Sequence, residues 1–262
     1  MSASANSTQY VDYAVEGSTA HVTLNSPHNR NALSSALVEQ LHQGMADAAA
    51  DPKVRAVVLG HTGGTFCAGA DLSEASGASG GEETTDRTRQ LTDLLRAILQ
   101  LPVPVVGAID GHVRAGGFGL VGACDIAVAG RNSTFALTEA RIGVAPAIIS
   151  LTLLPKMTAR AVGRYFLTGE KFDAEEAERV GLVTIAADDV PAAVAAITTE
   201  LGRASPQGLR ESKALTTAAI LDGFDRRAEE LNAQSARLFA SDEAREGMLA
   251  FLQKRPPSWT GG

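Results

Sequence analysis

Three short apolar runs in the first half of the chain limit what it can fold into. They span residues 54–59, 105–109 and 126–129 and are rich in Val, Ile and Ala. Continuous apolar runs of this length are typical of strands buried on both faces, as in the parallel sheets of α/β proteins. Helical patterns lie before and between these runs, so the sequence predicts an α/β core.

The longer segments carry helix and hairpin signals. Ser34 can cap a helix that ends near residue 50 and has Leu37, Leu41 and Met45 on its apolar side. The other predicted elements are a hairpin of residues 10–16 and 20–24, a short strand of residues 134–137, and helices of residues 84–100, 116–123, 148–154, 159–168, 174–180, 190–203, 209–220, 224–239 and 242–253. We therefore expect a core of residues 1–203 and an all-helical segment of residues 204–262.

Charge and cysteine content disfavour several classes of function. The 262 residues carry a formal net charge of −7 without a long basic run, so neither nucleic acid nor a membrane surface is an expected partner. No apolar window reaches the roughly 18 residues of a membrane span, and the first eight residues do not resemble a signal peptide. Cys67 and Cys124 form no C-x-x-C pair and the histidines lack metal-ligand spacing, so we expect no bound metal. Two thiols in such a chain favour a reducing compartment, the cytoplasm.

Two small-residue segments and one glutamate form the candidate site. Residues 66–72 and 111–117 each follow a predicted buried strand, and the second segment opens a helix. Short side chains let the backbone approach a ligand, and N–H groups at a helix start favour negative charge. Two such N–H groups aimed at one oxygen form an oxyanion hole. Glu139 supplies a carboxylate for moving a proton on the adjacent carbon.

Simpler or competing explanations exist for these motifs. A single Gly-rich turn is more often only a turn, and a lone Glu is more often solvated or capping. Gly117, Gly119 and Gly122 spell G-x-G-x-x-G, and Glu139 follows at the distance expected of a ribose-binding acid. That fingerprint needs its first Gly directly after a strand, whereas seven residues separate Gly117 from the end of the predicted strand, which disfavours a dinucleotide-binding oxidoreductase. Residues 77–81 spell G-x-S-x-G without a buried strand before them, and we interpret the match as chance.

Six segments occur in an order and spacing that match a known family. They are residues 29–33, 66–72, 111–125, 165–169, 177–183 and 246–255. Together they resemble the crotonase (enoyl-CoA hydratase/isomerase) superfamily over nearly the whole chain, from about residue 10 to residue 255. The resemblance implies a spiral of β-β-α units with a C-terminal all-helical trimerisation segment, assembled as a homo-oligomer, either a trimer or a dimer of trimers.

The resemblance also assigns roles to individual residues. It implies an oxyanion hole formed by the N–H groups of Ala70 and Gly116, with Glu139 as the catalytic acid–base group. The other residues expected at the acyl-CoA thioester are Arg30, Ala68, Asp71, Leu72, Gly117, Phe251 and Lys254. Arg30 is similar to a basic residue that meets the coenzyme's phosphates, and Phe251 and Lys254 resemble tail residues that close over the coenzyme of a neighbouring protomer. No cofactor is implied beyond the coenzyme A of the substrate.

The sequence departs from the family's hydratases at Gly119. Those enzymes commonly use two glutamates, of which the second matches Glu139 and the first falls on Gly119, which cannot hold water through a side chain. One carboxylate suffices to remove and return a proton beside a thioester. The sequence therefore predicts an enoyl-CoA hydratase or isomerase with a single glutamate. It leaves open an acyl-CoA-binding homologue without turnover, or another reaction such as thioester hydrolysis.

Residues 141–150 look like the bacterial methylglutaconyl-CoA hydratase-like branch of the superfamily. A substrate of that kind has a second carboxylate. Arg114 or Arg141 is a candidate to meet this group, although a structural or surface contact is the commoner role for each of them.

Overall fold

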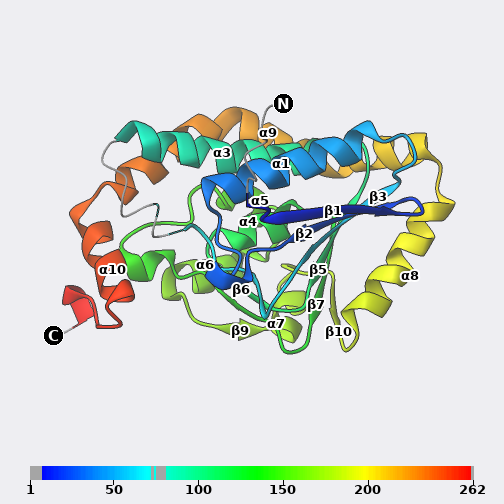
Figure 1. The fold of residues 1–262 in the computed structure, drawn as a ribbon. Coiled ribbons are helices and arrows are strands. Elements are labelled where there is room, and N and C mark those ends of the chain that lie inside the picture. The colour runs from blue at the N-terminus through cyan, green and yellow to red at the C-terminus, as the bar shows by residue number, and fades with distance from the viewer. Residues whose placement is uncertain (1–7, 72–73, 75–80, 261–262) are drawn as a thin grey trace, which may run out of the picture.

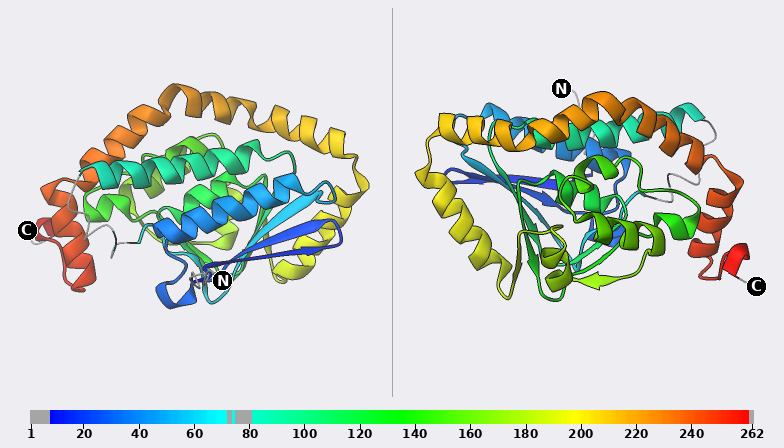
Figure 2. Two further views of the ribbon diagram at one scale, coloured as in Figure 1. Left: turned by 45° about the horizontal axis from the view of Figure 1, so that its top comes forward. Right: turned by 180° about the vertical axis from the view of Figure 1, so that it is seen from behind.

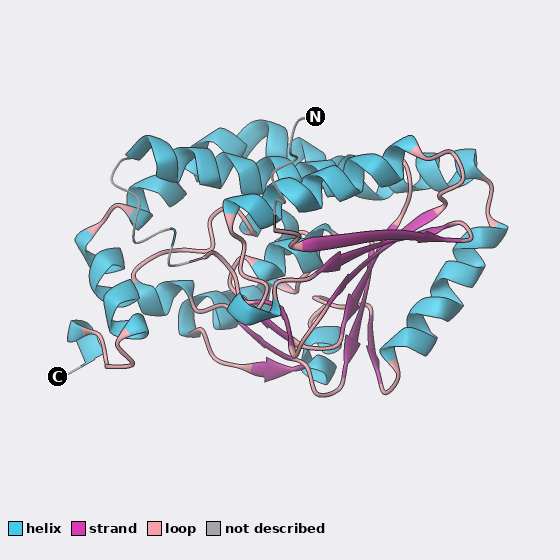
Figure 3. Ribbon diagram, viewed as in Figure 1, coloured by secondary structure: helices cyan, strands magenta, loops and turns pink. Residues whose placement is uncertain are grey.

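Two β-sheets lie on one side of a layer of long helices (Figure 1). The computed structural model describes residues 8–71, 74 and 81–260. Figure 3 shows how the strands converge below the helical layer. None of the described helices combines the length and apolar character that a bilayer span needs.

The larger sheet has six strands in the order β1-β2-β3-β5-β7-β10. They are β1 (Val11–Glu16), β2 (Thr19–Leu24), β3 (Ala56–His61), β5 (Val105–Ile109), β7 (Ile126–Gly130) and β10 (Ile185–Ala187). The first pair is the predicted antiparallel hairpin, and every other pair is parallel. The three apolar runs thus form the centre of this sheet, as predicted.

The smaller sheet has four very short strands in the order β4-β6-β8-β9. They are β4 (Thr65–Cys67), β6 (His112–Arg114), β8 (Thr134–Ala136) and β9 (Phe172–Asp173). Each of β3, β5 and β7 in the large sheet is followed by a strand of the small sheet and then by helical structure. This repetition is the spiral of β-β-α units that the sequence predicts.

Helices cover both faces of the large sheet. Figure 2 shows α1 (Ser35–Ala50), α3 (Gly81–Gln100) and α9 (Pro206–Phe239) side by side on one face. On the other face α8 (Val190–Arg203) packs against β3, β5 and β7. Alternation along the strands divides the two cores, because Val57 faces the main core and Val58 faces α8.

The remaining helices connect or follow these elements. They are η1 (Pro27–Asn29), α4 (Gly117–Ala123), η2 (Glu139–Ile142), α5 (Ser150–Leu153), α6 (Ala159–Thr168), α7 (Ala174–Arg179), α10 (Asp242–Leu252) and η3 (Ser258–Thr260). As predicted, Ser34 caps α1, because its side chain accepts a hydrogen bond from the Leu37 N–H. Figure 1 places α10 and α8 at opposite ends of the molecule.

Several sequence-based predictions of loops and helix breaks are wrong. No strand is predicted over residues 60–69 or 111–117, yet these stretches contain β4 and β6, and the region after residue 147, predicted as helices alone, contains β9 and β10. These strands have two or three residues, too few to show a period of two in the sequence. The predicted break between residues 220 and 224 is also absent, since α9 is continuous and packs along α3.

A buried ion pair ties α9 to the sheet. Lys213 is 4% exposed, and its Nζ lies 2.8 Å from a carboxylate oxygen of Asp125. The same ammonium donates hydrogen bonds to the backbone carbonyls of Ile98 and Val103. Asp125 in turn accepts the N–H of Val105 at the start of β5. Replacement of Lys213 removes the charged partner of the Asp125 carboxylate and of the Ile98 and Val103 carbonyls.

We predict that Lys213→Met lowers the free energy of unfolding by about 3–5 kcal/mol, because removal of one partner leaves a buried carboxylate without its counter-charge. Urea denaturation measures the change. Lys53→Met, at an exposed lysine, is the control and changes stability by no more than about 0.5 kcal/mol. Equal effects of the two substitutions would contradict the structural role of the ion pair.

Candidate active site

Three parallel strands of the small sheet bring the candidate residues to one edge. In β4, β6 and β8, Cys67 pairs with Val113, and Arg114 pairs with Ala136. Ala70 follows the end of β4 by three residues, Gly116 follows β6 by two, and Glu139 follows β8 by three. Carboxyl ends of parallel strands share one edge of a sheet, so the three residues that the sequence singles out are gathered there.

The backbone at Ala70 is oriented by Leu33. The Leu33 N–H donates to the Gly69 carbonyl at 2.8 Å, and the Leu33 carbonyl accepts from the Asp71 N–H at 3.4 Å. In this parallel bridge the N–H of Ala70 faces away from Leu33. In the sequence, residues 31–33 stand out only within the segment of residues 29–33 that resembles the family. Their role in orienting Ala70 depends on a pairing between residues far apart in the chain.

Gly69 and Gly116 let two loops come into contact. Gly69 has a φ of +89°, and a Cβ built on it would lie 2.8 Å from the Ala115 Cβ and 3.2 Å from the Gly116 nitrogen. A Cβ on Gly116 would lie 3.7 Å from the Ala70 nitrogen. Ala115 itself is held at a φ of 44°, a strained value for a residue with a side chain.

The two backbone N–H groups in this contact are unpaired. Neither the Ala70 N–H nor the Gly116 N–H donates a hydrogen bond to any described residue. Ala70 is exposed and Gly116 is half-buried, and Gly116 stands immediately before α4. The arrangement presents two neighbouring donors to solvent or to a ligand oxygen.

Glu139 is buried and incompletely satisfied. Its side chain is 7% exposed, and its Oε2 atom has no hydrogen-bond partner among the described residues. Burial raises the pKa of Glu139 to about 7, an effect that its own backbone N–H opposes in part. A carboxyl group that titrates near neutrality can both take up and release a proton.

The other predicted binding residues are distributed around this edge. Ala68 donates its N–H to the Arg30 carbonyl at 3.1 Å, and Arg30 is exposed with a left-handed φ of 59°. Asp71 accepts a hydrogen bond from the Asn29 side chain. Leu72 lies outside the described residues, as does most of the Gly-rich stretch after it. Gly117 is buried, and a Cβ on it would lie 2.8 Å from the Cβ of Cys67.

Phe251 and Lys254 lie elsewhere on the chain. Phe251 is 56% exposed near the end of α10, and the Lys254 N–H donates to its carbonyl. The start of α10 packs on η2, because a Cβ on Gly143 would lie 2.7 Å from the Glu243 backbone. The structure therefore links α10 to the segment that carries Glu139, while the predicted tail residues themselves remain on the surface.

Arg114 and Arg141 have structural partners. Arg114 donates to the carbonyls of Val113 and Thr134 and to the Thr134 hydroxyl. Arg141 donates to the Thr168 carbonyl. His112 and His61 also meet protein groups, the Thr134 hydroxyl and the Asp110 N–H respectively.

The three glycines of the G-x-G-x-x-G match face protein rather than a ligand. Cβ atoms built on Gly119 and Gly122 would lie 2.7 Å from atoms of Ile149 and Thr152, and Gly117 meets Cys67 in the same way. No space for a pyrophosphate remains beside them. The strand before Gly117 is closer than predicted, since β6 ends three residues before it, but the packing of the glycines against protein still disfavours dinucleotide binding.

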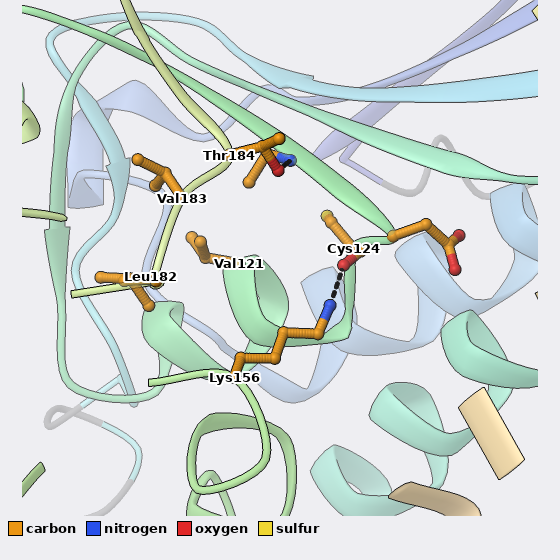
Figure 4. Close-up of a pocket in the computed structure, with 9 residues that line it drawn as sticks. Val121, Cys124, Lys156, Leu182, Val183 and Thr184 are labelled. Carbon is orange, nitrogen blue, oxygen red and sulfur yellow. Dashed lines mark hydrogen bonds between the residues drawn. The ribbon is translucent and has the colours of Figure 1, made fainter. Parts of the chain in front are cut away.

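A separate cavity of about 260 Å³ lies at the other end of α4 (Figure 4). Val121, Cys124, Lys156 and Thr184 are among its lining residues, and the Lys156 ammonium bonds to the Cys124 carbonyl. Both cysteines are buried and free, and burial raises the pKa of each thiol to about 12. The described residues contain no cluster of His, Cys, Asp and Glu that could hold a metal ion.

Comparison with known proteins identifies the family. The profile of the Enoyl-CoA hydratase/isomerase family matches residues 14–262. The crystal structure of an enoyl-CoA hydratase from Mycobacterium avium is 66% identical, with a TM-score of 0.90 and coverage of 96% of this chain and 99% of that chain. The 2,3-dehydroadipyl-CoA hydratase of Escherichia coli is 31% identical over 254 residues, 92% of this chain and 94% of its own. The mevalonyl-coenzyme A hydratase of Aspergillus fumigatus is 31% identical over 248 residues, 91% of this chain and 90% of its own.

The chain therefore belongs to the enoyl-CoA hydratase/isomerase family. The resemblance to the crotonase superfamily and the predicted fold class are confirmed. The protein is an enzyme of the hydratase/isomerase class with crotonase-type activity on acyl-CoA thioesters.

The burial of Glu139 generates a prediction about stability. Its carboxyl pKa is about 7 in the folded chain and 4.5 without the fold, and each pKa unit is worth about 1.4 kcal/mol. Ionisation therefore opposes folding fully above pH 7 and not at all below pH 4.5. Between these values, rising pH lowers the stability of the wild type by on the order of 3 kcal/mol relative to Glu139→Gln. Urea denaturation at several pH values measures the difference, and a difference independent of pH would contradict the burial.

Proposed function

We propose that this protein is an enoyl-CoA hydratase/isomerase in which the N–H groups of Ala70 and Gly116 stabilise the thioester enolate and Glu139 moves the proton. The observation that carries the proposal is the buried Oε2 of Glu139, which lies beyond the same sheet edge as the N–H groups of Ala70 and Gly116. None of these three groups has a hydrogen-bond partner among the residues that the structure describes. Burying a carboxylate oxygen without a partner opposes folding. Such perturbed groups cluster at functional sites.

The proposed reaction uses the two backbone N–H groups and the Glu139 carboxyl group. The thioester oxygen accepts hydrogen bonds from both N–H groups, which bind more strongly as negative charge develops on it. One donor of this type contributes about 3–4 kcal/mol to transition-state stabilisation. Ionised Glu139 removes the proton from the carbon beside the thioester, and the protonated carboxyl returns it to the same carbon or to a conjugated one.

The coenzyme extends over the loops that precede Ala70. Arg30 and Ala68 are joined by a backbone hydrogen bond, so a ligand in contact with Ala68 lies next to the exposed Arg30 chain. Arg30 can meet the coenzyme's phosphates there. Asp71 completes the described part of this site, and Leu72 stays a predicted contact outside the described residues.

We also propose a homo-oligomer, a trimer or a dimer of trimers. Apolar side chains are exposed at the C-terminal end: Leu249 (44%), Phe251 (56%), Leu252 (52%) and Trp259 (44%). Clustered exposed apolar residues of this kind mark interaction surfaces. Contact with another protomer would cover them and carry Phe251 and Lys254 to its coenzyme site. The two free thiols fit action in the cytoplasm.

Hydration of a 2-enoyl-CoA is the second candidate reaction. The observation in its favour is that the relatives named above are called hydratases. Glu139 alone would then have to position and deprotonate the water. Among possible acyl groups, methylglutaconyl-CoA is one candidate, although Arg114 and Arg141 already donate to protein oxygens.

We predict that Glu139→Gln lowers kcat on short 2-enoyl- and 3-enoyl-CoA substrates at least about 10²-fold, the typical contribution of a positioned acid–base group. Binding of acyl-CoA stays within a few-fold, because both N–H groups remain. For the wild type, kcat/KM rises with pH up to about 7, since the pKa of Glu139 is about 7 and the base must be ionised. Absorbance of the conjugated thioester and product mass measure both reactions.

Glu39→Gln is the matched control, because Glu39 is an exposed carboxylate on α1. It retains wild-type kinetics. Undiminished turnover by Glu139→Gln would refute the assignment of Glu139, and tight acyl-CoA binding by the wild type with no reaction of any substrate would favour a binding protein.

A further inference from the structure

The place beside Gly119 is filled by apolar side chains. A Cβ built on Gly119 would lie 2.7 Å from Ile149 Cγ2 and 3.1 Å from Leu95 Cδ1. Ile149 is 3% exposed and Leu95 is fully buried. A longer side chain therefore cannot be added at residue 119 unless Ile149 moves or is removed.

This filling is part of a close contact between α4 and α5. The Thr152 hydroxyl donates to the Gly119 carbonyl at 3.3 Å, and a Cβ on Gly122 would lie 2.7 Å from the same hydroxyl oxygen. Gly119 and Gly122 are one turn apart on α4, so both lie on the face that meets α5. The contact holds Ile149, the residue that precedes α5, against Gly119.

Gly119 is close to the proposed oxyanion hole. Its N–H donates to the Gly116 carbonyl at 3.0 Å, one turn along the helix. Three residues advance an α-helix by about 4.5 Å, so residue 119 lies one turn beyond the proposed oxyanion hole. By the resemblance, the family's hydratases carry their first glutamate at residue 119, so the Ile149 side chain occupies the space where that group would hold water.

We infer that Ile149 is a specificity-determining residue that excludes the hydrating water and directs this enzyme to double-bond isomerisation of 3-enoyl-CoA thioesters. The inference rests on the proposed roles of Ala70, Gly116 and Glu139. In the reaction, Glu139 removes a proton from C2, the C3–C4 double bond shifts to C2–C3, and the same proton or one from solvent is added at C4. No water is added and no group leaves.

The wild-type protein gives the first test. Purified protein is incubated with a short 3-enoyl-CoA and, separately, with the 2-enoyl isomer, and hydration is followed by the gain of one water in mass. The expected result is conversion of the 3-enoyl to the 2-enoyl form at least about 10²-fold faster than hydration, the scale of one missing acid–base group. Hydration as fast as isomerisation would overturn the inference.

Three variants test Ile149 directly. Ile149→Ala opens the space, Gly119→Glu supplies a carboxylate without space, and the double variant supplies both. Hydration by the double variant is expected to exceed that of either single variant by about 10²-fold. Equal hydration by the double variant and Ile149→Ala would contradict the role of Ile149.

Ile220→Ala is the matched control, because it removes the same side chain from a buried position on α9. It keeps the wild-type ratio of isomerisation to hydration. A changed ratio in this variant would show that loss of packing alone alters the reaction, which would also overturn the inference.

Exchange of α-protons separates this inference from the proposed function. A saturated acyl-CoA in D₂O exchanges its α-protons through the enolate without any need for water addition. Exchange by the wild type together with fast hydration would refute only the role of Ile149. Absence of both exchange and isomerisation would refute the proposed roles of the oxyanion hole and Glu139 as well.

Discussion

The contact between the Gly69 and Gly116 loops is the constraint on which the candidate site depends. It requires a left-handed backbone at Gly69 and leaves no room for a side chain there. The strands that deliver the two loops have only three residues each, and an isolated sheet of such strands is not stable in water. The large sheet therefore positions the small one, because β3 and β5 lead directly into β4 and β6.

Several unfavourable features accompany this geometry. Within the described part of the chain, two backbone N–H groups and one carboxylate oxygen lack partners, and Ala115 has a left-handed φ. The packed apolar cores on both faces of the large sheet and the buried Lys213–Asp125 pair supply the stability that tolerates these features. These groups follow the carboxyl ends of three parallel strands, at the edge where the proposed thioester site lies. That arrangement links the fold to the chemistry of its family.

The sequence predicts much of the fold because several elements carry strong local signals. The runs of residues 105–109 and 126–129 and the Ser34 cap identify β5, β7 and α1 nearly to the residue. By contrast, β4 and β6 arise from pairing between distant segments, and no pattern within three residues could reveal them. The continuity of α9 is set by its packing on α3, which overrides the weak breaking tendency of Gly223.

The sequence proposes which residues form the site but not what surrounds them. The motifs and the family resemblance indicate Ala70 and Gly116 as backbone donors and Glu139 as the acid. Contacts between residues far apart in the chain determine these surroundings. They are the burial of Glu139, the hydrogen bonds of Leu33 beside Ala70, and the packing of Ile149 against Gly119. In the sequence, Gly119 indicates that the first of the family's two glutamates is missing, but Ile149, which fills its place, lies 30 residues later.

In the proposed site, the N–H groups of Ala70 and Gly116 both donate to the thioester oxygen. Infrared difference spectroscopy of an acyl-CoA labelled with ¹³C at the thioester carbonyl tests it most directly. Binding is measured to Glu139→Gln, which keeps both backbone donors and prevents turnover. We predict a carbonyl stretch displaced to lower wavenumber than in water, because two fixed donors polarise the bond more than solvent does. A stretch unchanged on binding would contradict the account.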